Sequence, residues 1–188
     1  MSLSRFVGPA ALLIGLTVPL VAAAQAGGQP PMPKPGPEHA FFKMDAGTWD
    51  ATVEIIPAPG AKPETSKGVE VNTVGCGGLC LITDFKGEAM GMPFQGHGTT
   101  AWDVVKKKYV GSWTDSMSQG LAIGEATWDQ AAKKLTGSME GPDMTGKVVK
   151  TRSVVEYPSE GQRVFTAFTP GPDGKEMQLM KITYMRRK

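Results

Sequence analysis

From residue 48 onward the sequence is divided into short segments in which apolar and polar residues alternate, and this spacing constrains the fold more than any other feature. In the first segment Trp49, Ala51 and Val53 alternate with polar residues, which is typical of a strand with one buried face. Segments with similar patterning follow at residues 67–74, 79–90, 94–104, 107–115, 121–129, 133–140, 147–157, 162–169 and 175–185. The pattern therefore predicts about ten strands.

The connections between these segments are short and contain turn-forming residues, as in Gly91-Met92-Pro93. With 24 Gly and 15 Pro, the chain is also poorly suited to long helices. Because a parallel crossover needs a dozen or more residues, neighbouring strands are expected to be antiparallel. A meander of this length tends to close, since closure removes exposed sheet edges. We therefore expect an all-β, antiparallel up-and-down barrel, with a sandwich of two sheets as the competing architecture.

A short helix is expected just before the first strand, over residues 37–44. Pro37 suits the first helical position, Glu38 lies in the first turn, and Gly47 follows the end of the segment. This helix would cover one end of the barrel.

The first 26 residues have the three parts of a secretory signal. Arg5 precedes an apolar run from Val7 to Leu20, and the small residues that follow predict cleavage after Ala24 or Ala26. An uncleaved anchor is the less favoured alternative, because Gly and Pro interrupt the apolar run and leave it short for a membrane span. The expected organisation is a signal peptide (1–24), a mobile proline-rich linker (25–37) and a barrel domain (38–188).

The expected location is the periplasm or the extracellular space. No Cys precedes Cys76, so the cleavage region offers no acceptor for a lipoprotein modification. We expect no stable membrane insertion of the mature chain.

Charge and motifs argue against several functions. Twenty Lys and Arg against 18 Asp and Glu leave a net charge of +2, which gives no basic excess for binding a nucleic-acid backbone. The sequence contains no G-x-S-x-G elbow, no H-E-x-x-H motif and no phosphate-binding glycine loop. We therefore expect neither an enzyme nor a bound cofactor.

Gly47-Thr48-Trp49, at the junction of the expected helix and the first strand, resembles the G-x-W element of lipocalin-like barrels. In that architecture the Trp packs across the closed end of the barrel, beneath a basic residue from the last strand. The resemblance implies a structural role for Trp49 and a cation–π contact from Arg186 or Arg187.

A further set of motifs lies between residues 92 and 186, and the resemblance that it carries covers about residues 38–188. It comprises Met92-Pro93-Phe94-Gln95-Gly96, Ala101-Trp102-Asp103, Lys107-Lys108-Tyr109, Trp113-Thr114-Asp115-Ser116-Met117, Gly124, Gly174-Lys175-Glu176 and Tyr184-Met185-Arg186. This set is similar to the exported bacterial domain-of-unknown-function 1579 family, in which a Tyr usually stands where this chain has Trp102. The resemblance implies a lipocalin-like (calycin-like) barrel in an exported protein, and it brings no established activity.

Two cysteines in an exported chain usually form one disulfide. Cys76 and Cys80 are separated by three residues, and Gly77-Gly78 give the backbone the freedom to turn back between them. We predict a local disulfide, with free thiols or metal ligation as the alternatives. A zinc site would need two more ligands, and the spacing of the two histidines brings neither near these cysteines.

Tyr109, Trp113 and Asp115 share one face of a single predicted strand. If that face points inward, it offers two aromatic walls and one carboxylate, as a pocket for a small molecule requires. Phe85 and Trp102 are further candidates for its lining. The alternative is that the aromatic residues are ordinary core and that Asp115 ends the strand in a turn.

The leading functional hypothesis is binding of a small, partly apolar ligand in the barrel. An envelope structural or interaction module with a filled barrel is the alternative. A weaker hypothesis is haem or metal binding by His97 inside the barrel, against a hydrogen-bonded or solvent-facing histidine.

Overall fold

The computed structural model describes residues 31–171 and 173–188, so the predicted signal peptide and the first part of the predicted linker lie outside the described residues. The helical segments are η1 (Pro37–His39), α1 (Ala40–Asp45) and η2 (Cys76–Gly78). The strands are β1 (Gly47–Ile55), β2 (Glu64–Gly75), β3 (Cys80–Ala89), β4 (Met92–Asp103), β5 (Lys108–Asp115), β6 (Ala122–Asp129), β7 (Lys134–Pro142), β8 (Val148–Ser159), β9 (Gln162–Pro170) and β10 (Glu176–Arg186).

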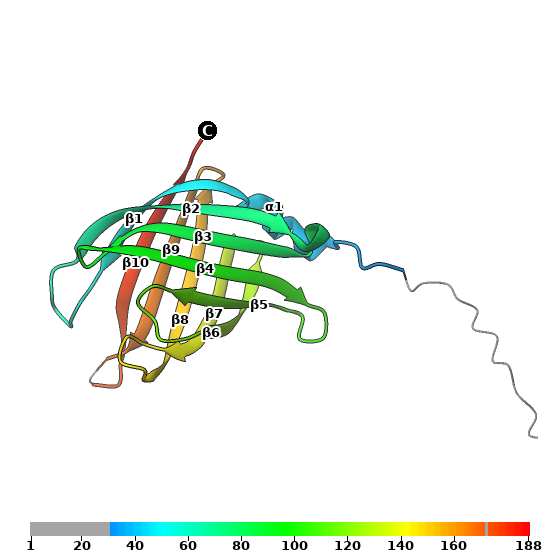
Figure 1. Cartoon of the computed structure of the whole chain (residues 1–188). Helices are drawn as coiled ribbons and strands as arrows, with labels where there is room; N and C mark the ends of the chain where they lie inside the picture. Colours follow the sequence, from blue (N-terminus) through cyan, green and yellow to red (C-terminus); the bar gives the residue numbers. More distant parts are fainter. Residues whose placement is uncertain (1–30, 172) are drawn as a thin grey trace, which may run out of the picture. The chain divides into compact units, whose positions relative to one another are not determined.

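Each strand pairs antiparallel with the next one along the chain, and β1 also pairs with β10, so the described strands form a closed ten-stranded barrel (Figure 1). This confirms the predicted fold, and the sandwich alternative is wrong. The predicted strand boundaries differ from the observed ones by at most three residues. The largest difference is at β2, which begins at Glu64 rather than at residue 67, because its first residues already pair with β1, with Ile55 opposite Glu64.

The barrel has two distinct ends. We call the end that carries α1 and the β2–β3, β4–β5, β6–β7 and β8–β9 connections the helix end, and the opposite one the far end. α1 lies beside the end of β2 (Figure 1). No helix among the described residues is both long and apolar enough to span a membrane.

The core is divided into two clusters along the barrel axis. One is at the helix end, where Phe41 and Phe42 of α1 pack against Leu81, Tyr109 and Tyr157 of the barrel. The other lies deeper in the barrel and consists of Trp49, Ala51, Val53, Phe85, Ile182 and Tyr184.

The predicted disulfide is confirmed. Cys76 and Cys80 are bonded across η2, with their Cα atoms 5.5 Å apart. Gly77 and Gly78 adopt φ values of 65° and 95°, which favour glycine and allow the chain to reverse within three residues. The bond therefore fixes the connection between β2 and β3.

Candidate functional site

The inner face of β6 to β9 is lined by small residues. Ala167 on β9 is buried, and Ser153 on β8 lies directly opposite it, so both face the interior. Gly137 on β7 lies opposite Ser153, and Ala126 on β6 lies opposite Gly137. These residues form a small-residue wall on one side of the barrel, made of Ala126, Gly137, Ser153 and Ala167.

Larger apolar residues that pack against the inner core remain only half-buried. Trp113, Phe165 and Met180 contact the cluster around Trp49 but keep partial exposure, although each belongs to a strand of the closed barrel. The Trp113 ring lies against the backbone of β4. A Cβ placed on Gly96 of β4 would come within 2.2 Å of that ring. The ring therefore lies flat on the neighbouring strand.

Three of the predicted ligand-binding residues lie away from α1. Phe85 and Trp113 belong to the inner core, and Asp115 ends β5 at the far end of the barrel. Phe85 is buried in the inner cluster, against which Trp113 packs. Trp113 Nε1 donates a 2.9 Å hydrogen bond to Asp115 Oδ2. The other Asp115 oxygen accepts from the backbone N–H groups of Met117 and Ser118, both at 2.8 Å, so this carboxylate also closes the turn after β5.

Tyr109 and Trp102 lie instead under η1 and α1, which together we call the helical plug. Their rings contact each other at 5.0 Å, and the Tyr109 ring also packs against Phe41 of α1. The Tyr109 hydroxyl donates a 2.7 Å hydrogen bond to the Glu38 carbonyl. Burial, and secondarily the Glu38 carboxylate, raise the pKa of Tyr109 to about 12. The five predicted ligand-binding residues are therefore divided between two regions of the barrel.

An ionic cluster that the sequence reasoning missed is buried next to the plug. Arg163 is 5% exposed and donates to both carboxylate oxygens of Asp45 at 2.7 Å, and its Nη2 also donates to Glu70. Asn72 donates to both carboxylates, at 3.0 and 2.9 Å, and the Tyr157 hydroxyl donates to Asp45 at 3.0 Å. These bonds fix α1 to β2, β8 and β9. The only sequence signal for Arg163 is its place two residues before Phe165 on the same strand face.

The Trp49 ring makes cation–π contacts with two guanidinium groups. Arg186 lies 4.1 Å and Arg163 lies 4.9 Å from its ring centroid. Arg186 also donates to backbone carbonyls of the α1–β1 segment. Of the two basic residues considered for this contact, Arg186 makes it, while Arg187 pairs with Asp50 on the outer surface.

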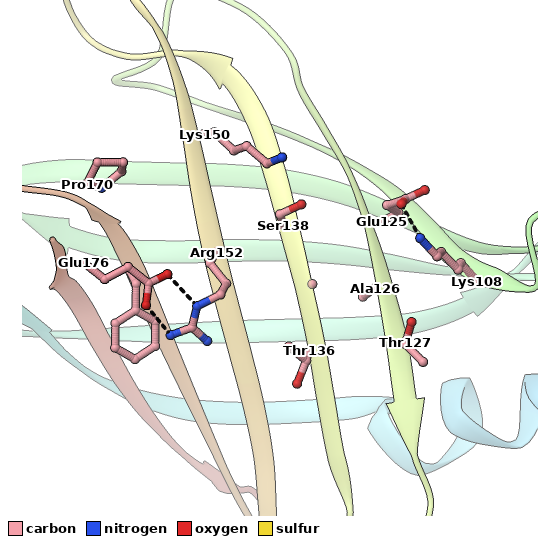
Figure 2. Close-up of a pocket in the computed structure, with 12 residues that line it drawn as sticks. Lys108, Glu125, Ala126, Thr127, Thr136, Ser138, Lys150, Arg152, Pro170 and Glu176 are labelled. Carbon is pink, nitrogen blue, oxygen red and sulfur yellow. Dashed lines mark hydrogen bonds and ion pairs between the residues drawn. The ribbon is translucent and has the colours of Figure 1, made fainter. Parts of the chain in front are cut away.

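A groove of about 500 Å³ crosses the outer face of β5 to β10 (Figure 2). Arg152 donates to both oxygens of Glu176 at 2.7 and 2.8 Å and lies 4.2 Å over the Phe168 ring. Across the groove, Lys108 pairs with Glu125. Four of the five charged side chains that line the groove form ion pairs with one another, so we place the candidate site in the barrel interior rather than here.

His97 does not lie inside the barrel, so the weaker hypothesis of a haem or metal ligand in the interior is wrong and the solvent-facing alternative is confirmed. Its imidazole is on the outer face, 54% exposed, and its Nδ1 lies 2.8 Å from an oxygen of Asp84. Alternation along β4 turns residue 97 outward because residues 96 and 98 are buried against the interior. The described residues contain no group of three or more His, Cys, Asp or Glu side chains arranged to hold a metal ion.

Comparisons with solved structures find the same architecture. An S-type phycobiliprotein lyase, CPES, from Guillardia theta superposes with a TM-score of 0.55 at 12% identity, covering 80% of this chain and 93% of that one. Rv2717c from M. tuberculosis superposes with a TM-score of 0.62 at 10% identity, covering 81% and 99%. At these identities the likeness shows the fold alone. A search of curated proteins found no match.

The sequence itself matches one family over most of its length. A family profile described as "Protein of unknown function (DUF1579)" matches residues 34–186, which include the helical plug, the whole barrel and the Trp49–Arg186 contact. This chain therefore belongs to the DUF1579 family of proteins of unknown function.

Proposed function

We propose that this chain is an exported protein that binds a small, partly apolar molecule inside the barrel, in the half away from α1. The observation that carries the proposal is the half-buried state of Trp113 and Phe165, which belong to the inner core and yet remain accessible. Interiors of filled barrels are close-packed, and their large apolar side chains are buried. Accessible aromatic surface is what a partly apolar ligand would cover.

The composition of the interior supports a ligand with both apolar and polar groups. Trp113, Phe165 and Met180 offer apolar contact, and the Ser153 hydroxyl offers polar contact. A thioether adapts to varied apolar shapes, so Met180 suits a pocket that accepts related molecules. No catalytic activity is part of the proposal.

Export is supported by the disulfide, because such bonds persist in oxidising compartments. Cell fractionation followed by N-terminal sequencing tests this part. We expect the processed chain to begin at Gln25 or Gly27. Recovery from the cytosol with Met1 intact would contradict export.

The binding proposal is tested by filling the interior. Ser153→Phe places an aromatic ring between Gly137 and Ala167, the small residues directly opposite it. The control is Val154→Phe, because residue 154 faces outward on the same strand. The probe is 1-anilinonaphthalene-8-sulfonate, with binding followed by its fluorescence and by quenching of tryptophan emission.

We expect saturable binding of one probe per chain, weakened at least about tenfold by Ser153→Phe and unchanged by Val154→Phe. Equal binding by all three proteins would place the probe outside the barrel and refute the proposal. Circular dichroism of each variant confirms that the barrel has folded.

A specific observation favours the alternative of an interaction module. Leu121, Ile123, Met144 and Val148 are 53–62% exposed at the far end, and such patches often mark contact surfaces. Under this alternative, size-exclusion chromatography shows a stable oligomer. The double variant Leu121→Ser with Ile123→Ser then runs as a monomer. A monomer that binds the probe supports the ligand-binding proposal instead.

A further inference from the structure

Two hairpin turns at the helix end have the same construction. In the β4–β5 turn, Asp103 accepts hydrogen bonds from the N–H groups two and three residues later, at 2.9 and 2.8 Å. In the β6–β7 turn, Asp129 does the same, at 2.9 and 3.0 Å. Because β5 pairs with β6, the two turns are neighbours on one rim of the barrel.

Each of these turns places a lysine in the left-handed region of backbone conformation. Lys107 has φ 54° and Lys133 has φ 49°. Glycine is the usual residue there, since a side chain makes this conformation unfavourable. The turn geometry therefore does not explain why each position carries a lysine.

The first turn also exposes apolar side chains beside its lysines. Val104 is 71% exposed and Val105 is 88% exposed, and Lys106 and Lys107 follow directly. Exposed apolar side chains next to basic ones suit the boundary between lipid headgroups and acyl chains. The apolar side chains can enter the acyl region while the lysines contact the anionic headgroups.

The acidic side chains within these two turns, and those beside their lysines on the flanking strands, already form hydrogen bonds or ion pairs. Asp103 and Asp129 accept the backbone hydrogen bonds of their own turns. Glu125 pairs with Lys108 and lies 3.6 Å from Lys106, and Lys134 pairs with Glu156. Within the part of the chain that the structure describes, Lys107 and Lys133 are in no ion pair.

We propose that the helix end of the barrel is a docking surface for an anionic lipid membrane. The Val104–Val105 tip enters the headgroup region, while Lys107 and Lys133 contact lipid phosphates. The contact is peripheral and reversible, because two valines bury far too little apolar surface for a stable anchor. The far end of the barrel then faces away from the lipid.

The test is co-sedimentation of the processed protein with vesicles of phosphatidylglycerol and phosphatidylcholine, compared with vesicles of phosphatidylcholine alone. We expect binding to the anionic vesicles only, weakening as salt is raised. The key variant is Lys107→Gly with Lys133→Gly, because glycine removes both charges and suits both backbone conformations.

We expect this double variant to bind anionic vesicles about 25-fold more weakly, at about fivefold per lysine, while resisting denaturant better than the parent protein. Val104→Ser with Val105→Ser should weaken vesicle binding about tenfold without changing its salt dependence. The matched control, Leu121→Ser with Ile123→Ser, removes two exposed apolar residues at the far end and should leave vesicle binding unchanged.

Three results would overturn the proposal. Binding to both kinds of vesicle would show that charge does not direct the contact. If Leu121→Ser with Ile123→Ser abolished vesicle binding while Val104→Ser with Val105→Ser did not, the membrane would contact the far end of the barrel instead. Tighter binding to a single-stranded oligonucleotide than to anionic vesicles would show that the lysines serve a different partner.

Discussion

The three tyrosines of the chain should make the fold sensitive to alkaline pH. Tyr109, Tyr157 and Tyr184 are 3%, 7% and 5% exposed. Burial raises the pKa of each phenol, with smaller contributions from Glu38, Asp45 and Glu70 respectively. The pKa of Tyr109 rises from 10.0 to about 12, and those of the other two rise well above 10.

The sign and size of the effect follow from proton linkage. Above pH 10 the unfolded chain releases phenolic protons that the folded chain retains, so stability is complete below pH 10 and decreases as pH rises towards the folded pKa. Each pH unit between the two pKa values corresponds to about 1.36 kcal/mol for one group. Tyr109 alone therefore accounts for roughly 2–3 kcal/mol of stability lost between pH 10 and about 12.

The measurement is a titration followed by phenolate absorbance at 295 nm and by far-ultraviolet circular dichroism. We expect the absorbance to stay low until the barrel unfolds and then to rise together with the loss of the dichroism signal. Tyr109→Phe should make stability less dependent on alkaline pH and cost about 1 kcal/mol at neutral pH, since it loses the bond to Glu38. A gradual absorbance rise centred near pH 10 in a protein that remains folded would refute the reasoning.

Three further predictions concern stability. Arg163→Met leaves two buried carboxylates without their cation, and urea unfolding should show a loss of about 3–5 kcal/mol. Cys76→Ser opens a small loop, and the chain-entropy relation gives a loss of roughly 2 kcal/mol, measured by thermal melting with and without reductant. Gly96→Ala places a methyl group 2.2 Å from the Trp113 ring, so we expect a loss of about 1–3 kcal/mol and a shifted tryptophan emission. Gly161→Ala, which has no atom within 4 Å of the new methyl group, is the neutral control; an equal loss in that variant would contradict the steric explanation.

The fold could be predicted because its determinants are local. Alternation of residue types marks each strand, and the turn residues between strands set their antiparallel order. The ionic cluster could not be predicted in this way. Arg163 is 118 residues from Asp45 and 93 from Glu70, so their contacts depend on the register of several strands. Only that register shows that all three occupy one end of the interior.

The candidate site shows a related limit. Tyr109 and Trp113 do share a strand face, as the alternation indicates, but four residues of strand separate them by about 13 Å. The first lies under the helical plug and the second belongs to the inner core. Alternation specifies the face of a residue and not its depth along the barrel. Candidate residues chosen by strand face alone therefore include some that pack under the helical plug and some that line the proposed pocket.

Glycine is needed at several positions of the inner face for a steric reason that does not depend on any ligand. A Cβ on Gly124 would lie 2.4 Å from the Ser138 carbonyl oxygen, and one on Gly137 would lie 2.6 Å from that of Glu125. The close approach of β6 and β7 therefore requires glycine whether or not the barrel is hollow. A ligand is indicated instead by residues that have side chains and are still incompletely covered, above all Trp113. The Ser153→Phe variant is informative for the same reason, because it enlarges an inward position that already carries a Cβ.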